Sequence, residues 1–180
     1  KLLSDLKYDV EALQKKLTEN NERCVCLRCR EIFRQRDNID ASVEPQIFVD
    51  EYETVGGTEY FITFEDPQRI AVYGFLRLRI PEVKTEETAI TTQLYTLMPE
   101  IKDAAFVREL HVYGQLVQIG KKNELATQHK GLGKRLMKKA EEIANKNNSK
   151  KIAVISGVGV RGYYQKLGYE KVGTYMVKGV

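Results

Sequence analysis

The segment Gln128–Arg135, which reads QHKGLGKR, places two glycines among basic residues directly before a helical pattern. The first turn of a helix has unpaired N–H groups and a partial positive charge, and glycine lets an anion approach the backbone closely. Together these properties are typical of a phosphate-binding site. The spacing is neither that of a Walker A loop nor that of the dinucleotide-binding glycine motif. A glycine-containing loop before a solvated basic helix remains the alternative.

The three cysteines of the chain, Cys24, Cys26 and Cys29, form the pattern C-x-C-x-x-C. An odd number at such close spacing argues against a disulfide framework. Thiolates at this spacing suit a tetrahedral zinc ion, with Zn–S distances of about 2.3 Å. The fourth ligand stays open between water, a carboxylate and a group outside this chain, because His111 and His129 lie in segments assigned to another site. Free thiols in a turn and a partial iron–sulphur cluster are the alternatives.

A third group of candidate residues lies in RELHVYG, residues 108–114. Glu109 is a candidate general base or water-positioning group. Its alternative role is that of a carboxylate paired with a nearby Arg or Lys. His111 is a candidate pocket residue. In an unbroken strand, Glu109 and His111 share one face and Arg108 and Leu110 share the other, unless a bulge intervenes.

The elements before these residues are one helix and three strands. Apolar residues recur at helical spacing over residues 4–19, which predicts a helix. Residues 46–53, 58–66 and 69–80 are rich in β-branched and aromatic residues, which predicts strands. Gly56-Gly57 predicts a hairpin turn between the first two strands. In the third strand, two leucines alternate with Arg77 and Arg79, as in a half-exposed strand.

The second half predicts a strand–helix–strand–helix–strand order. Residues 105–114 are expected to form a strand, residues 132–146 an amphipathic helix, and residues 151–156 a strand buried on both faces. A short helix over residues 160–169, ended by Gly168, precedes a last strand over residues 169–177. Residues 82–103 are expected to form a loop or a short helix. The fold class is therefore α+β, with a sheet that becomes parallel near its C-terminal half.

Composition permits a globular protein and excludes little else. The 180 residues suit one domain, or one domain with an appendage. Hydrophobic residues make up 42% and charged residues 30%, with a net charge of +4, which permits a phosphate-bearing partner without demanding one. No apolar run is long enough for a membrane helix and no signal peptide is visible. We expect no membrane partner and a reducing, cytoplasmic setting. The chain begins at Lys1, so we expect a fragment.

Two motifs in order, Q-x-x-G-x-G at a helix start and Y-Y-x-K-x-G-Y after the next strand, resemble the GNAT acyltransferase superfamily. The resemblance implies the GNAT fold, a mixed sheet flanked by helices. It implies that the glycine loop holds the pyrophosphate of acetyl-CoA and that the strand RELHVYG pairs with the pantetheine arm. It also implies that Tyr164 acts as general acid toward the leaving thiolate, with Tyr163 beside it. Two core aromatic residues are the alternative for this pair.

Longer stretches resemble one family more closely, the catalytic subunit of Elongator, which modifies the wobble uridine of tRNA. These stretches are VRELHVYG, QHKGLGKRLMKKAEEIA, KIAVISGVGVRGYYQKLGY and YMVK, together with CVCLRCREI and GFLRLRIP. The resemblance runs from about residue 23 to residue 178. It implies a structural zinc in residues 1–39, which we expect to form a remnant helix and a cysteine-rich segment, followed by a GNAT domain over residues 40–180.

The resemblance further implies a carboxymethyl-type modification at carbon 5 of the uridine, made with acetyl-CoA and a radical S-adenosylmethionine domain. The C-x-x-x-C motif of that domain's iron–sulphur cluster is absent from this sequence. We therefore expect S-adenosylmethionine and the cluster only in another domain of a full-length enzyme. The implied partner is tRNA, with other Elongator subunits or a second copy as further partners. Basic clusters at residues 28–36 and 130–139 are compatible with phosphate contacts.

The predicted site residues fall into three sets. The catalytic set is Tyr164, Tyr163 and Glu109, and the metal set is Cys24, Cys26 and Cys29. The cofactor-binding set is Glu109, Leu110, His111, Val112, Gln128, Gly131, Leu132, Gly133, Lys134 and Tyr164. Two other functions stay open at this point. One is a protein-lysine acetyltransferase, and the other is a non-catalytic module that senses acetyl-CoA or docks tRNA.

Overall fold

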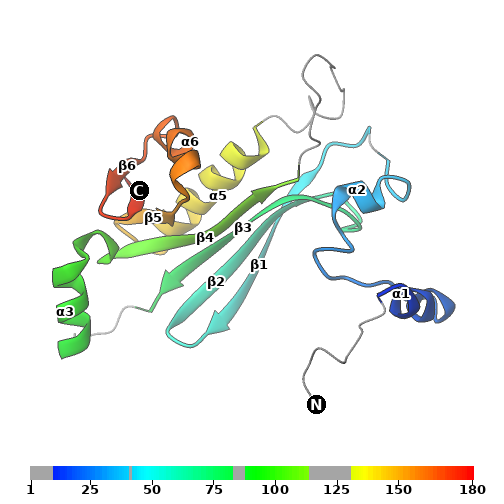
Figure 1. Ribbon diagram of the computed structural model, residues 1–180, viewed down its shortest axis with the longest axis horizontal. Helices are drawn as coiled ribbons and strands as arrows, with labels where there is room; N and C mark the ends of the chain where they lie inside the picture. Colours follow the sequence, from blue (N-terminus) through cyan, green and yellow to red (C-terminus); the bar gives the residue numbers. More distant parts are fainter. Residues whose placement is uncertain (1–9, 41, 83–87, 114–130) are drawn as a thin grey trace.

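The computed structural model describes residues 10–40, 42–82, 88–113 and 131–180 (Figure 1). In chain order the elements are α1 (Val10–Glu19), α2 (Ile32–Gln35), β1 (Gln46–Thr54), β2 (Gly57–Glu65), β3 (Val72–Pro81), α3 (Ala89–Leu97), the 3₁₀ turn η2 (Pro99–Ile101), β4 (Ala104–Val112), α5 (Leu132–Lys146), β5 (Lys151–Ile155), the 3₁₀ turn η3 (Val158–Val160), α6 (Arg161–Gln165), β6 (Glu170–Val172) and β7 (Tyr175–Gly179).

The described strands form one sheet in the order β1-β2-β3-β4-β5-β7-β6. Strands β1 to β4 pair antiparallel in sequence order, whereas β4 and β5 pair parallel, with α5 as the crossover helix between them. A parallel pair needs such a long connection, and an antiparallel pair does not. The predicted α+β class, with a mixed sheet flanked by helices, is confirmed.

The antiparallel part follows from the sequence as predicted. The turn between β1 and β2 contains Gly56 and Gly57 at φ +76° and +154°. A Cβ on Gly57 would lie 2.3 Å from the carbonyl oxygen of Ile80, so no larger residue fits there without a shift of the backbone. In β3 the leucines are buried, and Arg77 and Arg79 are partly exposed on the other face.

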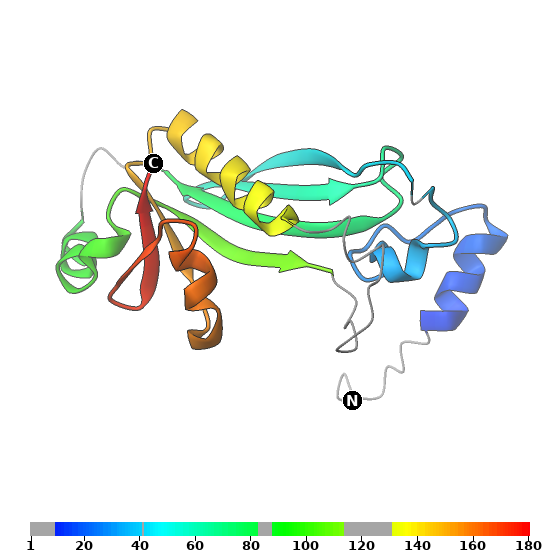
Figure 2. The same cartoon turned by 90° about the horizontal axis from the view of Figure 1, so that it is seen from above.

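Helix α5 covers one face of the sheet with an apolar stripe (Figures 1 and 2). Its buried residues recur at helical spacing and pack on β2, β3, β4 and β5. They are Leu132, Leu136, Met137, Ala140, Ile143 and Ala144. The opposite face of β1 to β4 has no helix of comparable length among the described residues.

The cysteine-rich segment is attached to the sheet at the start of β3. The backbone N–H of Val72 donates to the carbonyl of Arg30 at 2.6 Å, and Glu31 forms a parallel bridge with Val72. The Arg30 side chain donates to the buried carboxylate of Glu65. Ile32 belongs to the main core cluster. The segment is therefore held by backbone, charge and apolar contacts together.

Two element predictions need correction, and the short helix that was one of two expectations for residues 82–103 is present. The single strand expected over residues 169–177 is wrong, because the chain turns at Gly173, at φ +56°, and forms the hairpin of β6 and β7. The helix expected over residues 160–169 is shorter, since η3 precedes the five residues of α6. Within residues 82–103, α3 and η2 are helical. Residues 4–9 of the first predicted helix lie outside the described part of the chain.

No helix among the described residues combines the length and the apolar character that crossing a bilayer requires.

The packing of α5 gives a stability test. Leu136 is completely buried between α5 and the sheet. Leu136→Ala should lower the free energy of unfolding by about 2–5 kcal/mol, because it removes apolar contacts and leaves a cavity. Lys138→Ala, at an exposed position of the same helix, should change it by less than about 0.5 kcal/mol. Urea unfolding followed by circular dichroism measures both, and equal effects would contradict the assigned core face.

Candidate functional site

Strand β4 has a β-bulge next to Arg77 of β3. Leu78 lies opposite Val107, but Arg77 lies opposite Glu109, so Arg108 is an extra residue in β4. Arg108 and Glu109 are consequently both exposed, whereas Val107 and Leu110 pack against the core cluster. Simple alternation would have placed Arg108 with Leu110. The bulge changes that assignment and groups Arg108 with Glu109.

Strands β4 and β5 separate at the same point. Their parallel pairing starts at Ala104 and Lys151 and ends at Val107 and Val154. Beyond it and beyond the bulge residue Arg108, residues 109–112 of β4 pair with β3 on one side and with no described strand on the other. The free side presents backbone N–H and C=O groups that an extended ligand can pair with, as a peptide pairs with a sheet edge.

The first turn of α5 lies beside this free edge (Figure 2). Gly131 is the N-cap at φ +92°, a conformation that glycine adopts without strain, and it offers no side-chain acceptor to the first N–H groups. A Cβ on Gly133 would contact Val112 of β4 at 3.6 Å. Leu132 is buried in the core and Lys134 is exposed. Gln128, His129 and Lys130, the start of the predicted loop, lie outside the described residues.

The two tyrosines of α6 occupy different environments. Tyr164 is 6% exposed and packs in the core cluster, with its ring 5.9 Å from that of Tyr169. Tyr163 is 38% exposed, and a Cβ on Gly133 would lie 2.7 Å from its hydroxyl oxygen. Burial raises the pKa of both phenols, and the neighbouring Tyr163 raises the pKa of Tyr164 further. Both therefore stay protonated at neutral pH, and Tyr163 is the one whose hydroxyl lies at the glycine turn.

Glu109 and His111 lie on the exposed face of β4. Glu109 is 3.9 Å from Arg77, in an ion pair in which both side chains are partly exposed. This is the paired state that the sequence left open, and ion pairs of this exposure stabilise proteins little. The His111 ring stacks on Phe75 at 5.7 Å and meets Tyr113 edge-on at 4.6 Å. The structure thus places Glu109, Leu110, His111 and Val112 on the free segment of β4.

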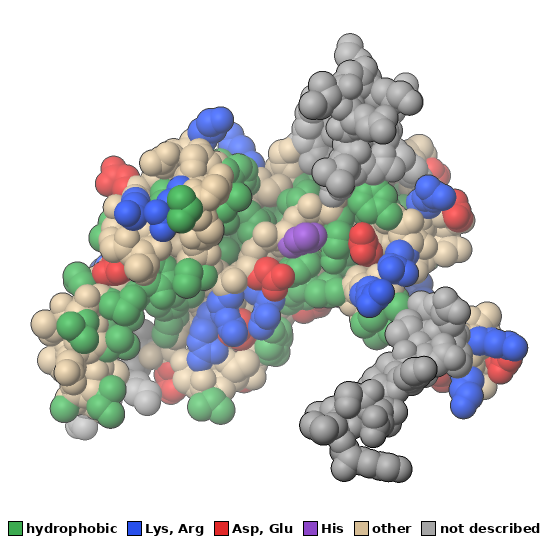
Figure 3. Space-filling model, in the orientation of Figure 1, with side chains coloured by type: hydrophobic (Ala, Val, Ile, Leu, Met, Phe, Trp, Pro, Cys, Tyr) green, Lys and Arg blue, Asp and Glu red, His purple; other side chains and the backbone are tan. Residues whose placement is uncertain are grey.

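The face of the sheet that carries Glu109 also contains a buried carboxylate, Glu59, that was not among the residues predicted from the sequence. Glu59 of β2 is 2% exposed and accepts hydrogen bonds from Arg108 at 2.6 Å and from Arg79 at 3.1 Å. In Figure 3 basic and acidic side chains lie next to each other on this face of the sheet. The available signal was the acidic residue Glu59 within a strand rich in aromatic and β-branched residues, with Arg77 and Arg79 in the next predicted strand.

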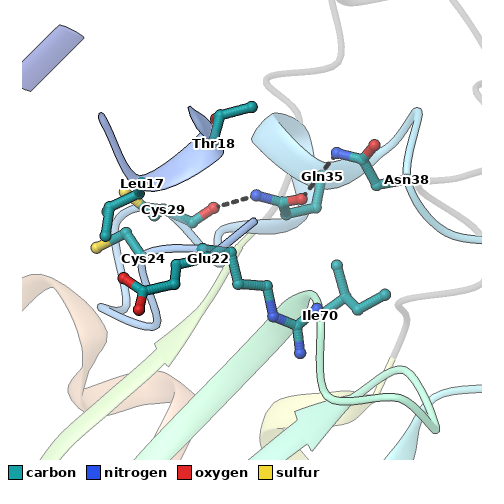
Figure 4. Close-up of a pocket in the computed structure, with 9 residues that line it drawn as sticks. Leu17, Thr18, Glu22, Cys24, Cys29, Gln35, Asn38 and Ile70 are labelled. Atoms are coloured by element: carbon teal, nitrogen blue, oxygen red, sulfur yellow. Dashed lines mark hydrogen bonds between the residues drawn. The ribbon is translucent and has the colours of Figure 1, made fainter. Parts of the chain in front are cut away.

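The cysteines form the second site. The three sulphur atoms of Cys24, Cys26 and Cys29 lie within 4.8 Å of one another. The backbone N–H of Cys29 donates to Cys26 Sγ at 3.4 Å, and this contact is the main reason why the pKa of Cys26 is lowered. A pocket of about 580 Å³ opens beside Cys24 and Cys29, between the end of α1 and α2 (Figure 4). Gln35 closes one side by donating to the Cys29 carbonyl at 2.6 Å.

The chain is similar to known acetyltransferases. Residues 124–179 match the acetyltransferase (GNAT) domain family. The tRNA uridine(34) acetyltransferase of Methanocaldococcus jannaschii is 40% identical over 93% of this chain and 30% of that protein. Elongator complex protein 3 of Schizosaccharomyces pombe is 41% identical over 87% of this chain and 27% of that protein. The chain therefore spans less than a third of the length of these relatives.

A solved structure agrees with the sequence relationship. The Elp3 protein of Methanocaldococcus infernus, with an N-terminal deletion, superposes with a TM-score of 0.73 at 37% identity. The match covers 94% of this chain and 38% of that one. The fold is the GNAT fold, and the cysteine-rich segment lies within the matched length.

The lowered pKa of Cys26 predicts its reactivity. In a metal-free Cys24→Ser/Cys29→Ser variant, Cys26 keeps the N–H donor of residue 29, so its thiolate should form at lower pH than in the unfolded chain. Alkylation rates measured from pH 6 to 10 should give a lower midpoint for the folded variant than for the same variant in guanidinium. Coincident midpoints would show that the contact with the Cys29 N–H does not form.

Proposed function

The chain belongs to the family of acetyltransferase domains found in tRNA uridine(34) acetyltransferases and in Elongator complex protein 3. We propose that it binds acetyl-CoA and supplies the acetyl group for modification of a tRNA wobble uridine. One observation carries this proposal. The free segment of β4, the glycine turn of α5 and Tyr163 of α6 converge on one another within the described residues, and Tyr164 follows directly on α6. In the proposed full-length enzyme, a radical S-adenosylmethionine domain would supply the radical chemistry at carbon 5, and the acetyl group, joined through its methyl carbon and freed from CoA by hydrolysis, would become the carboxymethyl-type group.

We use the name cleft for the proposed coenzyme site between residues 109–112 of β4, the start of α5 and α6. We assign the two ends of acetyl-CoA to different parts of this cleft. The pyrophosphate lies at the start of α5, where the backbone N–H groups of residues 131–134 and the Lys134 side chain meet an anion. The loop residue Gln128 is included through the motif. The pantetheine arm lies along the backbone of Glu109–Val112, in the position that a further strand would take. In this arrangement backbone groups make most of the contacts with acetyl-CoA. The side chains of residues 109–112 are accordingly free to face solvent or the core.

The catalytic step in this proposal is a proton transfer from tyrosine. Water attacks the thioester carbonyl and the C–S bond breaks. Tyr164 then donates its phenolic proton to the departing thiolate, since its raised pKa keeps the proton on the oxygen until a strong base forms. Tyr163 lines the same cleft and positions the thioester from the glycine side. Glu109, held by Arg77, orders water or accepts a proton at the cleft edge.

The partners follow from the relatives. Their names refer to tRNA and to the Elongator complex, so we propose tRNA as the acceptor, with other Elongator subunits or a second copy as protein partners, in the cytoplasm. The partly exposed Arg77, Arg79 and Arg108 on the open sheet face support contacts with phosphates. Residues 1–39 and 40–180 are the proposed division into a cysteine-rich segment and a GNAT domain.

The cysteine donor set fits a zinc ion. Zn–S distances of about 2.3 Å place tetrahedral ligands about 3.8 Å apart, within the 4.8 Å that separates the three sulphur atoms at most. The lowered pKa of Cys26 favours the thiolate that a metal requires. Cys24, Cys26 and Cys29 would hold the ion, which would supply structural cross-linking within the segment between α1 and α2.

The central experiment measures acetyl-CoA binding and thioester cleavage by this chain, with and without tRNA. We expect acetyl-CoA to bind, and tRNA to stimulate cleavage. Tyr164→Phe should reduce cleavage about 100-fold while binding persists, because only the proton donor is lost. Tyr52→Phe is the matched control, because it removes a hydroxyl from an exposed ring on β1 that has no part in the proposed site, and it should leave cleavage unchanged.

Other outcomes separate the remaining functions. Acetylation of lysine in a protein substrate without tRNA would favour a protein-lysine acetyltransferase. Binding without cleavage under any condition would favour a module that senses acetyl-CoA or docks tRNA. Failure to bind acetyl-CoA would overturn the assignment of the cleft.

Metal content tests the cysteine site. Purified protein should contain about one zinc ion per chain, and removal by a chelator should lower the melting temperature, because a structural site contributes directly to folding. Cys26→Ser should lose the zinc, whereas Val25→Ser, at an exposed neighbour, should retain it. Elemental analysis without bound zinc, together with an unchanged melting temperature after chelation, would refute the site.

A further inference from the structure

Glu59 lies two strands away from the free edge of β4, yet it contacts the bulge directly. Its side chain is 2% exposed, and its Oε1 atom accepts from Arg108 Nη1 at 2.6 Å. The same oxygen accepts from Arg79 Nη1 at 3.1 Å. Arg79 in turn donates to the carbonyl of Val55 at 2.7 Å. One buried carboxylate thus connects the β1–β2 turn, the end of β3 and the extra residue of β4.

The partner that Glu59 holds is the residue that makes the bulge. Arg108 is the unpaired residue between Val107, the last residue paired with β5, and Glu109, the first residue of the free segment. A bulge bends its strand and increases its local twist. A bond that fixes the side chain of Arg108 therefore also fixes the direction in which Glu109–Val112 leaves the sheet.

We infer that Glu59 is a positioning residue of the cleft, which acts through Arg108 to hold the β4 bulge and the backbone edge Glu109–Val112 in the geometry that binds the coenzyme. This inference rests on the proposed function, because the coenzyme assigned to that edge is acetyl-CoA. The hydrogen bonds of Glu59 go to Arg108 and Arg79, and neither residue belongs to the edge 109–112 or to the glycine turn. Its effect on binding is therefore indirect.

A second buried carboxylate on the same strand provides a matched control. Glu65 is completely buried, and both of its oxygens are satisfied, by Arg69 at 2.9 and 3.2 Å and by Thr63 at 2.6 Å. Its arginine partners, Arg30 and Arg69, lie outside β4. Glu59 Oε2, in contrast, is buried without a hydrogen-bond partner among the described residues. Glu65 therefore pairs with the cysteine-rich segment and with the turn before β3, whereas Glu59 pairs with the bulge residue of β4.

The test compares Glu59→Gln, Arg108→Ala, the double variant and Glu65→Gln, with two readouts. The first is the dissociation constant for CoA, and the second is amide hydrogen exchange of residues 109–112. Glu59→Gln and Arg108→Ala should each weaken CoA binding about tenfold, since small displacements of a binding edge are costly, and each should speed exchange in that segment. The double variant should be no weaker than either single variant, because Arg108→Ala leaves no charge-assisted contact with the bulge for Glu59→Gln to weaken.

The control defines what a purely structural role would look like. Glu65→Gln should lower the melting temperature but leave both the CoA dissociation constant and exchange in residues 109–112 at wild-type values. The inference is overturned if Glu59→Gln leaves both readouts unchanged, if the effects of the two single variants multiply, or if Glu65→Gln matches Glu59→Gln. Should Glu59→Gln not fold, Arg108→Ala alone decides, since Arg79 still pairs with Glu59 in that variant.

The two proposals fail differently. If the wild-type chain does not bind CoA, the proposed function fails, and the exchange of residues 109–112 alone then decides whether Glu59 holds the edge. If the wild type binds CoA and Glu59→Gln binds it equally well, the proposed function stands and the positioning role is refuted.

Discussion

The proposed coenzyme site of this protein depends on the point where β4 stops pairing with β5. A parallel pair keeps its hydrogen bonds only while both strands twist together, and the extra residue at Arg108 bends β4 out of that register. Among the residues that the structure describes, the result is an open backbone edge inside the sheet. Exposed edges are liabilities that proteins usually cover, so an edge that is kept open beside a glycine turn is well suited to pair with an extended ligand.

An unpaired edge of β4 keeps its shape only if the strands on the other side of β4 are held rigidly. The β1–β3 meander supplies a long antiparallel platform, and α5 buries its apolar stripe against one face of that platform. On the other face, two buried carboxylates of β2 gather arginines from separate elements. A buried ion pair often adds little net stability, because desolvation offsets the attraction. Its better-attested effect is to select one geometry, which is what a bulge and an attached cysteine segment require.

The sequence predicted the elements whose periodicity is strong and missed the features that depend on strand pairing. The helix at residues 132–146 and the meander of residues 46–80 follow from apolar spacing and from Gly56-Gly57. The hairpin of β6 and β7 was read as one strand, because a turn at Gly173 and Thr174 leaves little trace in so short a segment. The bulge depends on register between β3 and β4, and register is not encoded in either strand alone. Glu59 was missed for the same reason, since its partners come from β3 and β4.

The tyrosine pair illustrates how one short helix divides two tasks. Successive residues of a helix point about 100° apart, so Tyr163 and Tyr164 cannot face the same direction. In α6 one ring enters the core beside Tyr169, and the other reaches the turn at Gly133. The buried ring is held in place and its pKa is raised by desolvation, which suits a proton donor that must act late. The exposed ring of Tyr163 lies at the glycine turn, on the side where the proposed coenzyme site begins. A glycine at position 133 is consistent with that arrangement, because any larger side chain would occupy the position of the Tyr163 hydroxyl.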